Sequence, residues 1–167
     1  MAKKADNPDY DELPVDSPER KRLPLLLRRA WYNLNKTFRR RISHAGATPD
    51  QFTVLRTLHE GDAAGLTQSE LTRAMSSDPN TVASLLERME KGGWIERRPH
   101  ETDRRANRIL LKPAGKRKFT QLRDIAAGLQ LEILDVLPEK DREKFLDQLA
   151  DIAEAGHATA EEAARMK

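Results

Sequence analysis

The fold is decided by residues 67–112, which read TQSELTRAMSSDPNTVASLLERMEKGGWIERRPHETDRRANRILLK. This stretch predicts two short helices, Thr67–Met75 and Asp78–Lys91, because each opens on a capping residue and then carries apolar side chains at helical spacing. A β-hairpin over Trp94–Lys112 follows, with a polar and charged tip at His100–Ala106. Two helices joined by a tight turn and followed by a hairpin are typical of a winged helix-turn-helix lobe, which places its second helix in the major groove of DNA.

Helices are also predicted on both sides of this stretch. Apolar residues recur at steps of three and four over Leu23–Ile42, and Thr48-Pro49-Asp50-Gln51 has the pattern of a capping box. After the hairpin, Pro113 opens a long helix whose apolar residues over Phe119–Val136 are spaced like a coiled-coil seam. Pro138 separates it from a last helix. The chain is therefore expected to be mainly α-helical with a small β-hairpin wing.

The predicted elements divide the chain into three parts. They are a disordered tail at 1–18, a winged helix-turn-helix lobe at 47–112, and a helical dimerisation domain built from 19–46 and 113–160. Dimerisation is expected because the outer helices carry apolar faces that a small lobe cannot cover, whereas a second copy across a two-fold axis could. The residues expected at the dimer interface are Leu27, Phe119, Leu122, Leu129, Ile133, Phe145 and Leu149.

Composition and motifs argue against several other classes of protein. The chain has no cysteine, its four histidines have no metal-ligand spacing, and no glycine-rich phosphate loop or nucleophile elbow occurs, so no metal, cofactor or enzyme activity is expected. No segment resembles a signal peptide or is long enough to span a bilayer, which favours a cytoplasmic protein with no membrane partner. The net charge of +3 hides a basic hairpin and an acidic C-terminal region, and a local basic patch suits nucleic acid.

The candidate contacts to DNA from the two helices are polar residues at their first turns. The start of a recognition helix points at base edges, and an asparagine there can bond bidentately to adenine. In the first helix, backbone amides of the opening turn could hold a phosphate. Helix capping alone is the alternative for both turns. The residues concerned are Gln68, Ser69, Pro79, Asn80, Thr81 and Ser84.

The hairpin supplies the second set of candidates. Arg104 and Arg105 are predicted at its tip, where a guanidinium fits a narrow minor groove, and Asp103 would orient one of them through a bidentate pair. The flanking Arg97, Arg98 and Arg108 are expected to meet phosphates. The alternative is a solvated charged turn with no function.

The stretch from Asn80 to Lys116 resembles the MarR family of bacterial transcriptional regulators. Asp103-Arg104-Arg105 and the later Leu-Lys-Pro-Ala-Gly are its most diagnostic parts, and the order of elements agrees over Leu23–Leu149. One departure is Lys112, where the family usually has a threonine that would cap the next helix. The resemblance implies a homodimer that binds a pseudo-palindromic operator in double-stranded DNA. It also implies that a small, often phenolic, effector binds between the dimerisation helices and the lobe.

Five residues could line such an effector site: Trp31, Tyr32, Phe52, Arg56 and His59. Aromatic residues at helical spacing are more often core or dimer interface, so that interpretation stays open. We expect a sequence-specific DNA-binding regulator, a repressor rather than an activator, that a small aromatic or phenolic ligand releases. The alternatives are a winged-helix module for protein–protein contact and a DNA-binding regulator that needs no ligand.

Overall fold

The computed structural model describes residues 17, 21–103 and 106–166. In chain order its elements are α1 (Leu23–Ile42), the 3-10 turn η1 (Ser43–Ala45), α2 (Pro49–Glu60), β1 (Leu66–Thr67), α3 (Gln68–Ala74), α4 (Pro79–Lys91), β2 (Ile95–Pro99), β3 (Asn107–Leu111), α5 (Pro113–Leu134) and α6 (Glu139–Arg165). The protein is mainly helical with one small antiparallel sheet, as predicted. Most of the tail predicted at 1–18 lies outside the described residues, and Ser17, which is described, is buried.

Three helices begin where the cap motifs predict. At α2, the Thr48 hydroxyl accepts the Gln51 amide and the Gln51 side chain accepts the Thr48 amide, at 3.3 and 2.9 Å. The same reciprocal box opens α3, and an aspartate followed by proline opens α4. These bonds satisfy amides that a helix start otherwise leaves without partners. Local sequence is therefore enough to fix these boundaries.

The sheet has three strands in the order β1-β3-β2, one more than the sequence predicts. The hairpin strands β2 and β3 pair from Ile95 opposite Leu111 to Pro99 opposite Asn107. The extra strand, β1, pairs Leu66 with Ile109 and Thr67 with Arg108. A strand of two residues gives no periodic signal, which is why it was not predicted. It joins the start of α3 directly to the wing.

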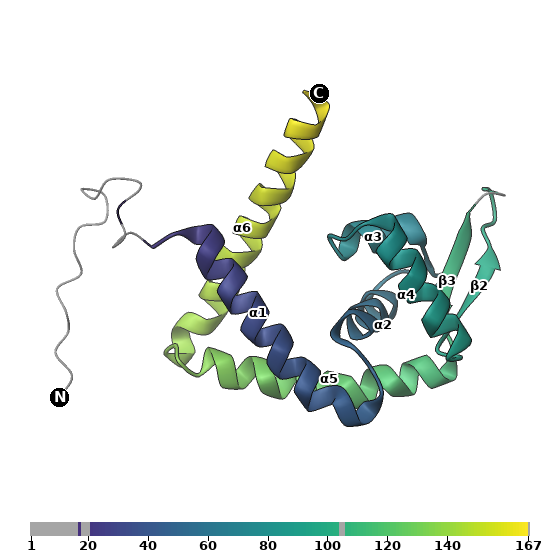
Figure 1. The fold of residues 1–167 in the computed structure, drawn as a ribbon, viewed down its shortest axis with the longest axis horizontal. Helices are drawn as coiled ribbons and strands as arrows, with labels where there is room; N and C mark the ends of the chain where they lie inside the picture. The colour runs from purple at the N-terminus through teal and green to yellow at the C-terminus, as the bar shows by residue number, and fades with distance from the viewer. Residues whose placement is uncertain (1–16, 18–20, 104–105, 167) are drawn as a thin grey trace.

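A single buried core connects the helix-turn-helix to the long helices. Its fully buried side chains come from α1, α2, α3, α4, α5 and the sheet, and include Ile42, Leu55, Leu71, Leu86, Met89, Ile95, Ile109 and Leu122. Helix α5 contacts α1, α2 and β3, so it passes beneath the lobe before reaching the other end of the molecule (Figure 1). The sheet and α6 lie near opposite ends of α5.

The structure corrects the assignment of three residues to the dimer interface. Phe119, Leu122 and Leu129 are at most 3% exposed within the single chain. Phe119 stacks on Phe52 of α2 with ring centroids 6.0 Å apart. The coiled-coil interpretation predicts that the apolar face of α5 packs against a second copy. Over most of its length this face packs instead against α2 and α1 of the same chain.

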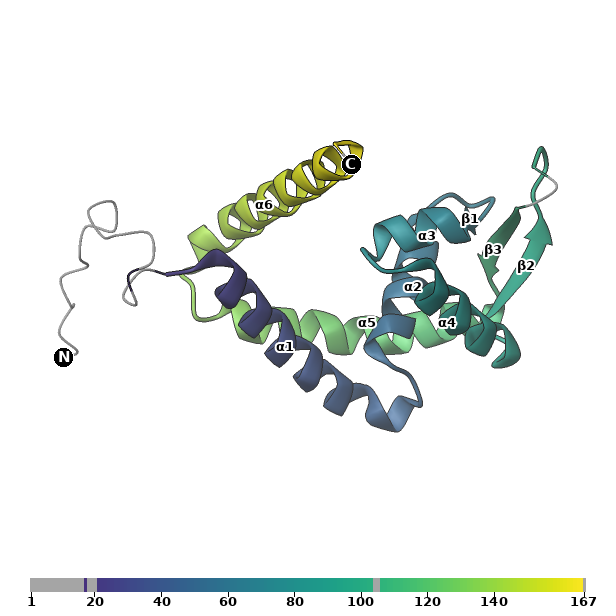
Figure 2. The same cartoon turned by 45° about the horizontal axis from the view of Figure 1, so that its top comes forward.

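Helix α6 stands apart from the core. It leaves the end of α5 and projects away from it in both views (Figure 2). None of its described residues is buried. Arg142 ties its start to the preceding turn, through Asp135 at 2.7 Å and the Leu137 carbonyl at 3.2 Å. Large apolar side chains stay exposed on α1, at the end of α5, in the turn that follows it and on α6: Leu23, Leu25, Leu26, Leu27, Trp31, Tyr32, Leu34, Leu131, Ile133, Val136, Phe145 and Ile152.

Candidate nucleic-acid interface

The first turn of α3 carries two polar residues, one exposed to solvent and one hydrogen-bonded to α4. Ser69 is exposed on this turn. Gln68 is half-buried, and its side-chain amide donates to the carbonyl of Pro79 at 3.3 Å. Pro79 is the first residue of α4, so Gln68 links the starts of the two helices. The sequence predicts that Gln68 contacts a phosphate or caps α3, and it contains no signal for this link to α4.

The start of α4 combines a strong cap with exposed polar side chains. Asp78 Oδ1 accepts the amides of Asn80 at 3.1 Å and Thr81 at 2.9 Å. Hydrogen bonds from the side chain and the amide of Thr81 are the main reason why the pKa of Asp78 is lowered. Asn80, Thr81 and Ser84 are exposed, whereas the opposite face of α4 is buried in the core. The capping role of Asp78 thus leaves the Asn80 side chain on the surface.

A hollow of about 340 Å³ lies between α3 and the wing. It is lined by Thr67, Gln68, Ser69, Arg97, Ala106, Asn107 and Ile109. Three of these residues, Gln68, Ser69 and Arg97, were predicted separately from the helix start and the hairpin, and the fold brings them to one place. Arg97 lies 3.5 Å from the Glu90 carboxylate of α4. Asn107, the exposed first residue of β3, was not predicted, because nothing in its local sequence distinguishes it from other turn-flanking polar residues.

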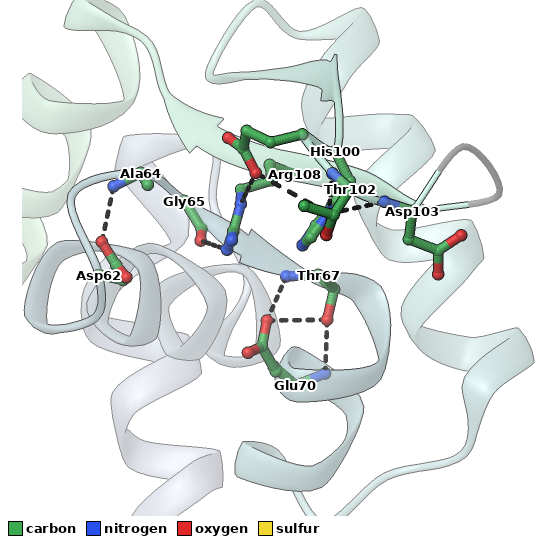
Figure 3. Close-up of polar contacts among 10 residues, drawn as sticks. Asp62, Ala64, Gly65, Thr67, Glu70, His100, Thr102, Asp103 and Arg108 are labelled. Atoms are coloured by element: carbon green, nitrogen blue, oxygen red, sulfur yellow. Dashed lines mark hydrogen bonds and ion pairs between the residues drawn. The ribbon is translucent and has the colours of Figure 1, made fainter.

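The wing is held close to its tip by ion pairs and side-chain hydrogen bonds (Figure 3). Arg108 of β3 donates to Glu101 Oε2 at 3.0 Å and to the Gly65 carbonyl at 2.9 Å, and its side chain is only 19% exposed. The pKa of Arg108 is raised by the Glu101 carboxylate, and the pKa of Glu101 is lowered by its own amide and by Arg108. The expected phosphate contact of Arg108 is therefore replaced by bonds within the chain. Arg98 is more exposed and pairs with Glu96.

The tip of the wing is described only in part. Asp103 is exposed and its amide donates to His100 Nδ1 at 3.2 Å. The predicted tip residues Arg104 and Arg105 lie outside the described residues. Their assignment remains a prediction from the sequence.

The predicted effector residues fall into two groups. Phe52 and His59 of α2 lie against Phe119, with the His59 ring 4.2 Å from the Phe119 ring. The Arg56 guanidinium lies 4.9 Å from the Phe52 ring. Trp31 and Tyr32 are about 60% exposed on α1, and the described contacts do not join them to this cluster. Arg56 Nε and Asn35 Oδ1 are buried and make no hydrogen bond. Arg56 Nε does lie 3.8 Å from Glu60 Oε1, one turn further along α2.

The remaining dimer candidates are accessible. Leu27, Ile133 and Phe145 are 39–44% exposed, and Leu149 is half-buried. Among residues 17, 21–103 and 106–166, no cluster of three potential metal ligands occurs. Over the same ranges, no helix combines the length and apolar character needed to cross a bilayer.

The arrangement of α3, α4 and the β2–β3 hairpin defines a winged helix-turn-helix protein. Residues 47–106, which form most of this lobe, match the model of the MarR family. It is 29% identical to the HTH-type transcriptional regulator PecS of Dickeya dadantii over 122 residues, which are 72% of this chain and 69% of PecS. It is 26% identical to the HTH-type transcriptional regulator BilQ of Clostridium symbiosum over 101 residues, 60% of this chain and 70% of BilQ.

Solved structures share the fold at low sequence identity. The S. aureus MepR–DNA complex superposes with a TM-score of 0.73 at 20% identity, over 81% of this chain and 99% of MepR. CouR from Rhodococcus jostii RHA1 bound to p-coumaroyl-CoA superposes with a TM-score of 0.70 at 22% identity, over 78% of this chain and 90% of CouR. At such identities the likeness supports the fold alone.

Proposed function

We propose that this protein is a transcriptional regulator that binds double-stranded DNA through α3, α4 and the wing. The observation that carries the proposal is the hollow that joins the start of α3 to Arg97 and Asn107 of the wing. It places the polar start of α3 and an arginine of the hairpin on one side of the lobe. The exposed start of α4 is linked to the same place by Gln68. The fold neighbour MepR was solved as a DNA complex, which agrees with this use of the fold.

Each side chain then has a distinct part in binding. Asn80 would read an adenine edge in the major groove, with Pro79, Thr81 and Ser84 on the same surface of α4. Ser69 and Arg97 would hold a backbone phosphate at the hollow. By sequence, Arg104 and Arg105 would enter the neighbouring minor groove with Asp103 orienting one of them.

A second copy of the chain completes the proposal. The exposed apolar residues of α1, of the end of α5 and of α6, including Leu27, Ile133 and Phe145, would pack against their counterparts across a two-fold axis. Two α4 helices must lie about 34 Å apart, one turn of DNA, to bind one face of a duplex. Such a dimer would recognise a pseudo-palindromic operator and would repress transcription by occupying a promoter.

Selection of bound duplexes from a random-sequence pool tests this function. We expect the full chain to enrich an inverted repeat, and its affinity for that repeat to fall steeply with salt because counterions are released from neutralised phosphates. The rival interpretation, a winged helix that contacts other proteins, predicts no enrichment and no salt-dependent binding to duplex DNA.

Regulation by a small aromatic anion is our second proposal. It rests on the cluster of Phe52, Arg56, His59 and Phe119, together with Arg56 Nε and Asn35 Oδ1, which are buried and make no hydrogen bond. Arg56 Nε faces the Glu60 carboxylate at 3.8 Å, so an anion would have to compete with that carboxylate for Arg56. Such a ligand would bind between α1, α2 and α5. It would lower the affinity for DNA only by the factor by which it binds the DNA-free arrangement of the two lobes more tightly than the DNA-bound arrangement. The fold neighbour CouR was solved with p-coumaroyl-CoA.

The test is to titrate a panel of phenols and aromatic carboxylates into the protein–duplex complex. Release of the duplex by a panel member, and loss of that response in Arg56→Ala, would support the effector site. If the whole panel leaves the complex intact at millimolar concentration, the rival of a ligand-independent regulator is favoured.

A further inference from the structure

The turn that leads to the wing tip is organised by one imidazole nitrogen. His100 Nδ1 accepts the backbone amides of Thr102 at 3.3 Å and Asp103 at 3.2 Å (Figure 3). Backbone amides can only donate, so Nδ1 is the acceptor in both bonds. The Thr102 hydroxyl, at 3.4 Å, and Glu101 Oε2, at 3.8 Å, also face this nitrogen. The His100 side chain is only 18% exposed. The backbone closes the same turn, because the His100 amide donates to the Ala106 carbonyl and the Ala106 amide donates to the Asp103 carbonyl.

The neighbouring residues anchor this turn to the helix-turn-helix. Glu101 pairs with Arg108, and Arg108 in turn donates to the carbonyl of Gly65, which precedes β1 and lies 43 residues away in the sequence. Gly65 has a φ of +92°, and a β-carbon there would lie 2.7 Å from the Ile109 carbonyl oxygen. The backbone of the loop before β1 therefore lies close to β3. The hydrogen bond from Arg108 to the Gly65 carbonyl joins this loop to the wing.

We propose that His100, Glu101 and Arg108 are positioning residues for DNA binding, forming a polar clamp that fixes the wing tip relative to α3. The clamp (these three residues) holds the amides of Thr102 and Asp103, and Asp103 directly precedes Arg104 and Arg105 in the sequence. This inference rests on the proposed DNA-binding function. The clamp side chains bond to the chain itself, so they act on DNA through the geometry of the turn.

For Glu101→Ala, the clamp and simple electrostatics predict opposite changes in DNA affinity. Glu101→Ala removes a negative charge next to a proposed DNA surface and releases Arg108, so simple electrostatics predicts tighter binding. The clamp predicts weaker binding, because Arg108 loses its partner on the wing. The matched control is Glu96→Ala, which removes the same charge from β2, where Glu96 pairs with Arg98. We expect Glu96→Ala to bind as well as or better than the wild-type protein.

A pair of substitutions at His100 tests the acceptor directly. His100→Ala removes the acceptor, whereas His100→Asn places an amide oxygen close to the position of Nδ1. We expect His100→Ala and Glu101→Ala to bind the duplex enriched by the wild-type protein roughly three- to tenfold more weakly, the effect of one or two hydrogen bonds. His100→Asn should bind within about twofold of wild type, since it restores the acceptor. His157→Ala, in α6, controls for loss of a histidine.

A readout without DNA completes the experiment. Exchange of the Thr102 and Asp103 amide protons, followed by NMR, should accelerate in His100→Ala and stay slow in His100→Asn, with the thermal midpoint of the protein unchanged. Equal or tighter duplex binding by both His100→Ala and Glu101→Ala would overturn the clamp and leave the proposed function standing. Failure of His100→Asn to restore binding would also overturn it. If the wild-type protein enriches no duplex, the proposed function falls, and the clamp with it.

Discussion

The first turn of α5 lies directly on the backbone of Trp94: a β-carbon added at Gly115 would lie 2.1 Å from the Trp94 carbonyl oxygen. That oxygen already accepts the amide of Lys112 at 2.9 Å. Lys118 adds a third link, because its ammonium lies 5.5 Å from the Trp94 ring and donates to the Ala45 carbonyl at 2.7 Å. The base of the wing and the start of α5 therefore form one rigid joint.

Gly115→Ala should destabilise the protein by about 1–3 kcal/mol, because the added methyl group overlaps backbone atoms that cannot rotate away. The measurement is urea unfolding of the full chain. Gly156→Ala is the matched control: Gly156 is helical, and nothing lies within 4 Å of its added β-carbon. It should gain about 0.5–1 kcal/mol from helix propensity. A neutral Gly115→Ala would show that α5 can separate from the wing at little cost.

Two apolar residues on α5 should respond differently to aspartate. Ile133 is 44% exposed, so Ile133→Asp should give a folded monomer if a second copy covers this face. Leu129 is 3% exposed in the chain's own core, so Leu129→Asp should unfold the protein because it buries an unpaired charge. Sedimentation and circular dichroism distinguish these results. A wild-type protein that sediments as a monomer at micromolar concentration would contradict the proposed dimer.

Asn80→Ala should cost about 1–3 kcal/mol of binding free energy on the enriched duplex and much less on random duplex. The fold should be unaffected, because the Asn80 side chain is exposed and Asp78 caps α4 through backbone amides. Fluorescence anisotropy with the two duplexes measures both affinities. Equal losses on both would mean that Asn80 contacts the DNA backbone rather than a base.

Arg97→Ala should lower the slope of log affinity against log salt by about one, the effect of losing one phosphate contact. The reason is its place in the hollow beside Ser69. Arg165→Ala, which removes the same charge from the end of α6, should leave the slope unchanged. If the two variants behave alike, the hollow does not seat a phosphate.

The capping box of α3 should make stability depend on pH in the acid range. The pKa of Glu70 is lowered from about 4.5, mainly by hydrogen bonds from the backbone and side chain of Thr67. A carboxyl group whose pKa is lowered by folding stabilises the folded state above its unfolded pKa, and this contribution is lost as the pH falls through the folded pKa. Thr67→Ala should cost about 1 kcal/mol at neutral pH. Below about pH 4 the difference in unfolding free energy between wild type and Thr67→Ala should shrink, and a constant difference would refute this role.

Much of the lobe could be predicted because its signals are local. Thr48, Thr67 and Asp78 mark three helix starts within three residues of their partners, and the polar starts of α3 and α4 follow from them. The match of residues 47–106 to the MarR family could likewise be predicted from one contiguous stretch.

The rest depends on contacts between distant residues. Arg108 looks like a phosphate ligand in the sequence, but Gly65, 43 residues earlier, accepts its hydrogen bond. Phe119 has the spacing of a seam between chains, but an aromatic ring of α2 lies against it. Periodicity identifies a face that must be buried and gives no information about which element buries it. The same limit explains why the hydrogen bonds of His100 could not be foreseen.

Helix α6 has 27 residues, about 40 Å of helix, and none of them is buried within the described chain. If a second chain covers its apolar residues between Phe145 and Ile152, their burial would depend on protein concentration. With the proposed second copy, the unfolding midpoint should rise with protein concentration, whereas the packed lobe holds its own core at any dilution. The concentration of the protein in the cell would then itself control DNA binding. Below the dissociation constant of the proposed dimer, the chain would be a monomer whose folded lobe can contact only one half-site of the operator.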